Sequence, residues 1–341
     1  MTTVNKKKLI QTSIKVVISA ALIFWIIQGV ELSEIFAIIG SANLFILLFA
    51  FVFKLIGYYI SAIRWRILLR AQGADATIPF LVSSYFVGFF LNNILPSSIG
   101  GDVVRIYDSW RAGTNRPTAV TVVFVDRFLG SIALLFFILA TLLIPIQLPA
   151  ELPVSRIGIF TVTVGMIALC WFIFVAPRTL SKFIAKLNLP FLGKINATLS
   201  KIADAFEIFQ QKRRALLNSM LLSIALQVNV VLYHYIVAQS LDLSVPFYSY
   251  FITIPLYTLI TTLPISINGI GVRENLFIFF FSLFGVPRTE ALAYSWLLYG
   301  ILIVQGLLGG LVYALRRDLP VNHDLKNSNL KQSNSEVKQD V

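Results

Sequence analysis

The sequence has little charge and almost no cysteine or histidine. Only 13% of its 341 residues are Asp, Glu, Lys or Arg, and it contains one cysteine, Cys170, and two histidines, His234 and His323. A single cysteine excludes a disulfide framework. Because the two histidines lie far apart along the chain, we expect no metal site, no Cys/His nucleophile pair and no cofactor. The sequence therefore does not suggest an enzyme.

Long apolar runs are the main feature that is present. Hydrophobic residues make up 57% of the chain, whereas soluble domains have about 45–50% apolar residues. Mean hydropathy is +0.81. Runs of roughly 17–25 apolar residues are long enough to cross a hydrocarbon core of about 30 Å as helices. The fold class we predict is an all-α polytopic membrane protein.

The apolar runs predict six full spans and two re-entrant hairpins. The spans are residues 9–29, 43–63, 118–146, 157–176, 216–239 and 291–315. The shorter runs 79–95 and 247–263 lead straight into "LPSSIGGDVVR" and "LPISINGIGVR", and the run 274–284 is too short to cross. We interpret each Pro/Gly stretch as the tip of a hairpin that enters and leaves on the same side.

The distribution of Lys and Arg sets the orientation. Of 28 such residues, this arrangement places 22 in cytoplasmic segments, 3 in outer segments and 3 in spans. Such a bias predicts that both termini are cytoplasmic, in what we expect to be the plasma (inner) membrane of a prokaryote. It also attributes the net charge of +12 to topology and not to nucleic acid. Residues 193–214 resemble an amphipathic surface helix, and 316–341 a disordered tail.

The two Pro/Gly stretches are copies of one motif. They share the pattern P-x-S-I-x-G-x-x-V-R at a constant offset of 168 residues. We therefore predict a single transmembrane domain, 1–315, built from two halves. The halves are about 43–146 with motif one at 95–105, and about 216–315 with motif two at 263–274. Because motif one is entered from the cytoplasm and motif two from outside, the halves are expected to form an inverted repeat, an arrangement common in secondary transporters.

The motifs are also the candidate binding site. A backbone break inside a membrane is tolerated only against protein or a water-filled cavity, and helix N-termini favour anions. We expect helices to begin at Gly101 and Gly269, with an arginine one turn later to clamp a phosphate. The candidate substrate-binding residues are Ser98, Gly100, Gly101, Arg105, Ser266, Asn268, Gly269 and Arg273. Alternatively, the glycines serve only tight packing and the arginines only neutralise nearby acids.

Four further charges are candidates for ion pairing or ion coupling: Asp102, Asp126, Arg127 and Glu274. Asp126 and Arg127 lie inside a long span, where ionisable groups usually face an interior, and they are expected to pair with charges of motif one. Adjacent helical residues point about 100° apart. We therefore expect Arg273 to face a cavity while Glu274 pairs elsewhere or carries a proton.

The segments "LPSSIGGDVVR", "DRFLG" and "LPISINGIGVRE", with "RWR" at the end of the second span, resemble the flippase-like family. This is the transmembrane region of lysylphosphatidylglycerol synthases, which also occurs as stand-alone membrane proteins. The resemblance covers roughly residues 9–315 and implies movement of a lipid between leaflets. The longest soluble stretch is too short for an aminoacyltransferase domain, so lipid synthesis by this chain is not expected.

The function we predict is translocation of a phospholipid or another lipid-linked anion, with the head group held at the interface of the two half-helix motifs. No P-loop is visible, so the driving force would be a gradient or mass action. One alternative is a secondary transporter of a small soluble anion. Another is a membrane-embedded accessory component of lipid-linked glycan or aminoacyl-lipid synthesis, acting beside a separate lipid-modifying enzyme.

Overall fold

The structure is a computed structural model, and it describes residues 31–94, 100–143, 158, 160–161, 163–168, 209, 211–262, 266 and 269–316. Several predicted segments lie outside the described residues. They are the span 9–29, nearly all of the surface helix 193–214, the tail beyond Arg316, and the motif residues Ser98 and Asn268.

Every regular element among the described residues is a helix. The helices are α2 (Leu32–Gly40), α3 (Leu44–Ala71), α4 (Ile78–Ile94), α5 (Gly100–Arg111), α6 (Arg116–Leu143), α10 (Arg213–Ser240), η1 (Phe247–Ser249), α11 (Tyr250–Thr262), α12 (Val272–Ser282) and α13 (Arg288–Leu315). Four of them, α3, α6, α10 and α13, are long and apolar enough to cross a membrane. They correspond to four of the six predicted spans. Of the other two, 9–29 is not described and 157–176 is described only in part.

The order of helix lengths occurs twice along the chain. Helices α3, α4, α5 and α6 have 28, 17, 12 and 28 residues, and helices α10, α11, α12 and α13 have 28, 13, 11 and 28. In each set the two short helices flank a Pro/Gly motif. The duplication seen in the motif therefore extends to the helices around it.

The helix that contains the second predicted span continues past residue 63 to Ala71 and carries "RWR" near its end. One predicted boundary is wrong. The helix after motif two begins at Val272 and not at Gly269. Gly269 and Gly271 have φ values of +74° and +84°, a conformation that glycine adopts easily and an α-helix does not contain, so the helix starts only after them.

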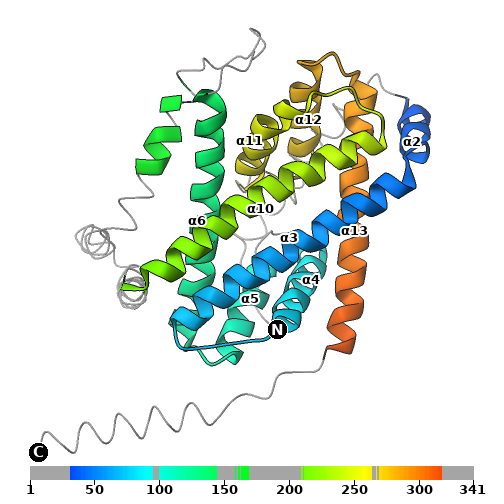
Figure 1. The fold of residues 1–341 in the computed structure, drawn as a ribbon. Coiled ribbons are helices and arrows are strands. Elements are labelled where there is room, and N and C mark those ends of the chain that lie inside the picture. The colour runs from blue at the N-terminus through cyan, green and yellow to red at the C-terminus, as the bar shows by residue number, and fades with distance from the viewer. Residues whose placement is uncertain are drawn as a thin grey trace, which may run out of the picture.

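The two corresponding long helices α3 and α10 pack side by side in opposite directions (Figure 1). The backbone N–H of Asn43, just before α3, donates to the carbonyl oxygen of Ser240 at the end of α10, at 2.8 Å. Near the other end of the pair, Arg64 of α3 contacts Ser223 of α10. Asn43 also caps α3, because its side-chain oxygen accepts from the backbone N–H groups of Phe45 and Ile46.

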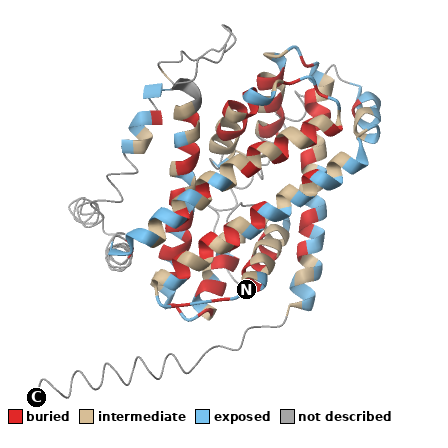
Figure 2. Ribbon diagram, viewed as in Figure 1, coloured by how far each residue is buried: buried red, intermediate tan, exposed pale blue. Residues whose placement is uncertain are grey.

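The short helices cross over to the opposite half. Helix α4 packs on α13, and its counterpart α11 packs on α6, with Leu134, Ile138 and Ile252 in the contact. In Figure 1, α4 and α5 lie in the lower half of the bundle, and α11 and α12 lie in the upper half. Figure 2 shows the buried residues concentrated inside the bundle. Exposed apolar side chains such as Leu307 and Leu311 cover the outer side of α13, as expected of a helix that faces lipid.

Glycines allow α4 and α13 to approach closely, and this contact yields a prediction. A Cβ atom added to Gly309 would lie 2.0 Å from the carbonyl oxygen of Phe86, and one added to Gly300 on the same helix would meet nothing within 4 Å. We expect Gly309→Ala to force α4 and α13 apart and to lower the free energy of unfolding by about 1–3 kcal/mol or more. Gly300→Ala is the matched control and should be neutral or slightly stabilising, because alanine favours helix. Equal melting curves of the two variants in detergent would contradict this role of Gly309.

Candidate functional site

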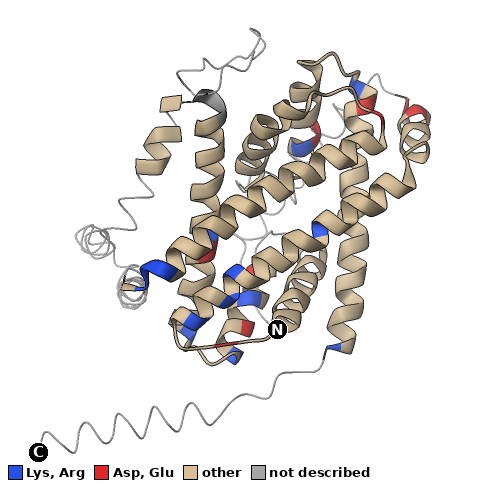
Figure 3. Cartoon of the chain, viewed as in Figure 1, with Lys and Arg blue, Asp and Glu red and all other residues tan. Residues whose placement is uncertain are grey.

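Lys, Arg, Asp and Glu are sparse along the helices (Figure 3). Six charged side chains are buried among the described residues. They are Arg64, Arg105, Asp108, Asp126, Arg273 and Glu274. Ionisable groups at membrane depth are costly and need a partner or a function. Five of the six gather beside the two motifs. The sixth, Asp108, pairs with Arg316 at 2.9 Å and ties α5 to the end of α13.

Beside motif one, a single carboxylate holds two arginines. Arg64 of α3 donates from Nε and Nη2 to the two oxygens of Asp126 on α6, at 2.6 and 2.9 Å. Arg105 of α5 donates from Nη2 to the same Asp126 at 2.7 Å. The remaining arm of Arg64 donates to the Ser223 hydroxyl of α10 at 2.8 Å. The cluster therefore joins four helices from both halves.

Arg105 is further enclosed by aromatic rings. Its guanidinium carbon lies 4.8 Å from the ring centre of Trp65 and 5.0 Å from that of Tyr85, a favourable cation–π arrangement. Its Nε atom is buried without a hydrogen-bond partner. Asp126 therefore binds the Arg105 guanidinium, where we expected a phosphate to bind.

The charges of "DRFLG" both meet motif one. Asp126 binds Arg105, and Arg127 binds Asp102 with 2.6 Å between Nε and Oδ2. The second pair differs from the first in exposure, because the Arg127 side chain is 51% exposed whereas Asp126 is 1% exposed. Asp102 and Arg127 can therefore reach the surroundings of the bundle, and Asp126 cannot.

The glycines of motif one serve close packing. A Cβ added to Gly88 of α4 would lie 2.9 Å from the Cα of Gly101, and one added to Gly100 would lie 3.0 Å from Asn92 Oδ1. The same Asn92 oxygen accepts from the N–H of Gly101 at 2.8 Å and so caps α5. These contacts favour the packing alternative for Gly100 and Gly101, because the amide at the start of α5 is already taken.

Motif two has a different local structure. Gly269 and Gly271 turn the chain with positive φ, and the N–H of Gly271 donates to Glu274 Oε2 at 2.6 Å, which caps the start of α12. The Asn275 amide donates back to the Gly271 carbonyl oxygen at 2.7 Å. The Ser266 hydroxyl is buried without a hydrogen-bond partner. The turn is therefore held by α12 itself.

The expectation that Arg273 and Glu274 face different partners is wrong. Arg273 Nη2 donates to Glu274 Oε1, and Arg273 Nε donates to the Ser295 hydroxyl of α13 at 3.0 Å. The backbone directions of the two residues do diverge, but long side chains bend toward each other when burial removes water as a competing partner. Arg273 also lies over the ring of Tyr299, at 4.8 Å.

Arg273 lines a cavity of about 80 Å³ where α3, α10, α11, α12 and α13 meet. Polar and aromatic side chains form most of its lining: Lys54, Tyr233, His234, Tyr257, Arg273 and Gln305. Apolar residues of α13 complete the lining. Lys54 Nζ lies 4.6 Å from the ring centre of Tyr233. No motif-one residue in the described part of the chain lines this cavity. The described residues of motif one therefore do not reach this cavity, which differs from the expectation that the head group lies between the two motifs.

Sequence reasoning missed most of this lining. Lys54 lies inside a predicted span, and Arg64 is the first arginine of "RWR" at the end of that span, but neither position predicts which residue it contacts. His234 and Gln305 are polar residues of long, mainly apolar helices, and α10 also carries Gln227 and Asn229. A polar residue in such a helix indicates a packed interior or a cavity. The sequence does not show which polar residues face the same cavity, because α3 and α10 have no periodic polar stripe.

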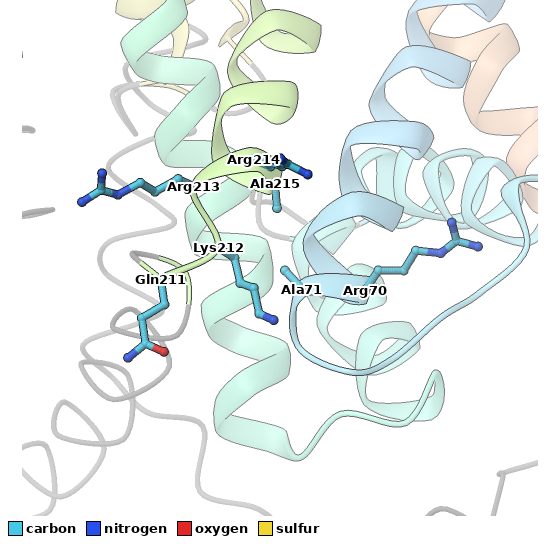
Figure 4. A pocket seen from close by; sticks show the side chains of 7 residues that line it. All are labelled: Arg70, Ala71, Gln211, Lys212, Arg213, Arg214 and Ala215. Atoms are coloured by element: carbon cyan, nitrogen blue, oxygen red, sulfur yellow. The ribbon is translucent and has the colours of Figure 1, made fainter.

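A second pocket, of about 470 Å³, lies between the end of α3 and the start of α10 (Figure 4). It is lined by Arg70, Ala71, Gln211, Lys212, Arg213, Arg214 and Ala215. Figure 4 shows Lys212 extending toward Ala71, while Arg213 and Arg214 point to opposite sides. Its four cations are exposed. Cations gather in this way at the cytoplasmic ends of membrane helices, so topology accounts for them without a ligand.

Comparison with known proteins gives a family match over most of the chain. Residues 13–309 match the model of the lysylphosphatidylglycerol synthase TM region. The UPF0104 membrane protein PH1989 of Pyrococcus horikoshii is 23% identical over 342 residues, covering 93% of this chain and 99% of that protein. The UPF0104 membrane protein MJ1595 of Methanocaldococcus jannaschii is 25% identical over 305 residues, covering 84% of this chain and 89% of that protein.

Proposed function

The chain belongs to the family of the lysylphosphatidylglycerol synthase transmembrane region, and we propose that it moves a phospholipid or another lipid-linked anion between membrane leaflets. It is an integral membrane protein with several apolar helices. The observation that carries the proposal is the cavity beside motif two. There the two cations Arg273 and Lys54 line a cavity between helices whose outer faces expose apolar residues. A cation at that depth is expensive unless it binds something.

The architecture supports a transport role. We propose that the two halves form an inverted repeat with re-entrant hairpins. The antiparallel pairing of α3 with α10 and the placement of the hairpins at opposite ends of the bundle support this arrangement (Figure 1). Two such halves can exchange roles, which is the basis of alternating access in transporters built this way.

We also propose the orientation. The C-terminal ends of α3, α5 and α13 and the start of α10 lie in the lower half of Figure 1. These ends carry Arg66, Arg70, Arg111, Arg213 and Arg214, and Arg316 follows α13. This side would face the cytoplasm of a prokaryotic cell. Both termini would then be cytoplasmic.

For coupling to an ion, the surface pair of Asp102 and Arg127 is the strongest candidate. Asp126 and Glu274 each have all carboxylate oxygens bound by protein donors. Asp102 instead faces a half-exposed arginine, so a proton can reach it with less rearrangement. A small soluble anion would fit the same cavity chemistry, and an accessory role beside a lipid-modifying enzyme would leave the cavity in use.

The test is lipid movement by the purified full-length chain in vesicles. Phosphatidylglycerol with a fluorescent label on one acyl chain would be placed in both leaflets, and a membrane-impermeant quencher added outside. We expect quenching to proceed past the outer-leaflet half in vesicles with protein, and to stop there in protein-free vesicles. Identical traces would contradict lipid translocation. Uptake of radiolabelled phosphate by those vesicles would then favour the soluble-anion alternative.

A further inference from the structure

We infer that the cavity beside motif two selects a head group with one net negative charge and discriminates against head groups that carry an added amino group. The inference rests on the proposed function and names its substrate class. Three observations carry it: the charges around the cavity, the occupied carboxylate of Glu274, and an unused amide donor of Gln305.

The first observation is the charge balance. Two cations, Lys54 and Arg273, line the cavity, and the nearest carboxylate is Glu274. Lys54 has no carboxylate partner among the described residues, and its ammonium group lies 4.6 Å from the ring centre of Tyr233. The surroundings therefore carry one net positive charge. One phosphodiester neutralises it, whereas a zwitterionic head group leaves it uncompensated in a region of low dielectric.

The second observation is that Glu274 is already saturated. Its Oε2 accepts from the Gly271 N–H, and its Oε1 accepts from Arg273 and from the Ser295 hydroxyl at 3.4 Å. An ammonium group of a lipid would need such a carboxylate to replace its water. Moving Glu274 toward it would uncap α12 and leave Arg273 unpaired. An added amino group therefore finds no free carboxylate at Glu274.

The third observation is an unused hydrogen-bond donor on Gln305. Gln305 is 1% exposed, its Oε1 accepts from the Tyr58 hydroxyl at 3.0 Å, and its Nε2 has no hydrogen-bond partner. Because Tyr58 occupies the oxygen, the amide presents only N–H donors. With Lys54 and Arg273 the cavity offers donors to oxygen acceptors, which is what a phosphodiester supplies.

The size of the cavity agrees with this class of ligand. A water molecule requires roughly 10–15 Å³ of such space, so about 80 Å³ accommodates a group of several heavy atoms, such as a phosphate with its oxygens. The glycerol and acyl chains would have to remain outside it. The lined space thus fits the anionic part of a lipid and not a whole head group with a long side chain.

The test compares lipids that differ in head-group charge. Vesicles with full-length protein would contain acyl-labelled phosphatidylglycerol, phosphatidylethanolamine or aminoacylated phosphatidylglycerol. We expect phosphatidylglycerol to move at least tenfold faster than the other two. Gln305→Glu adds a carboxylate of the same shape and should abolish that preference. Gln227→Glu, on α10 and outside the cavity lining, is the matched control and should retain it.

A binding measurement separates failure of the inference from failure of the function. Short-chain phosphatidylglycerol should raise the melting temperature of the detergent-solubilised protein, and short-chain phosphatidylethanolamine should not. Faster movement of all three lipids than in protein-free vesicles, at equal rates, would overturn the selectivity but keep translocation. Selective stabilisation without any movement would keep the anion site and overturn translocation. Neither movement nor stabilisation would overturn both.

Discussion

Replacing Arg273 with glutamine should reduce lipid movement by about a hundredfold or more. Arg273 lines the cavity and is buried, so its charge reaches a bound phosphate with little screening by water. Loss of one partner of a buried, hydrogen-bonded charge pair costs about 3–5 kcal/mol, and each 1.4 kcal/mol is roughly a factor of ten. Arg273→Lys keeps the charge but loses the planar fork, and we expect an intermediate rate. The measurement is the initial rate of quenching in vesicles.

Folding must be separated from binding in this experiment. Arg273→Gln leaves Glu274 as a buried carboxylate without its cation, so the single variant should also lower folded yield. The double variant Arg273→Gln with Glu274→Gln removes both charges and keeps an oxygen acceptor for the Gly271 N–H. We expect it to recover folded yield and to remain inactive. Recovery of transport in the double variant would show that Arg273 serves only to neutralise Glu274.

Replacing Asp126 with asparagine should destabilise the protein more than any other change in the motif-one cluster. It leaves Arg64 and Arg105 buried without a counter-charge, and we expect a loss of about 3–5 kcal/mol, seen as a lower melting temperature and less monodisperse protein. Arg64→Gln should follow, because Arg64 makes three hydrogen bonds. Arg105→Gln should cost least, since it leaves the Arg64–Asp126 pair complete.

The matched control for this series is Asp75→Asn, which also removes an aspartate that pairs with two arginines. Asp75 lies in the loop after α3, where its side chain is 44% exposed and pairs with Arg66 and Arg70. A hydrogen bond from Arg66 keeps the pKa of Asp75 well below its usual range, so the carboxylate stays ionised during the assay. Exposed pairs are worth about 0–1 kcal/mol. Similar losses in Asp75→Asn and Asp126→Asn would contradict the special role of the buried cluster.

The sequence alone determined the class of protein, the helices and the duplication. Apolar runs long enough to cross a bilayer predict helices, because only helices satisfy their own backbone hydrogen bonds in lipid. The repeated P-x-S-I-x-G-x-x-V-R pattern located both breaks, and each lies between two short helices. Asp126 and Arg105 stood out as charges that needed partners. These features depend on residues close together in the chain.

Only the tertiary structure decided which residues meet. Asp126 takes Arg64 of α3 as its second partner, and Lys54 joins Arg273 around one cavity, although 219 positions separate them in the sequence. Helices that are apolar on every side carry no stripe that marks an inner face, so their packing partners are chosen by small residues such as Gly309 and by the pairing of buried charges. The hydrogen bond between Arg273 and Glu274 was likewise decided by the tertiary structure. Helical geometry separates their backbones, and burial between packed helices brings their side chains together.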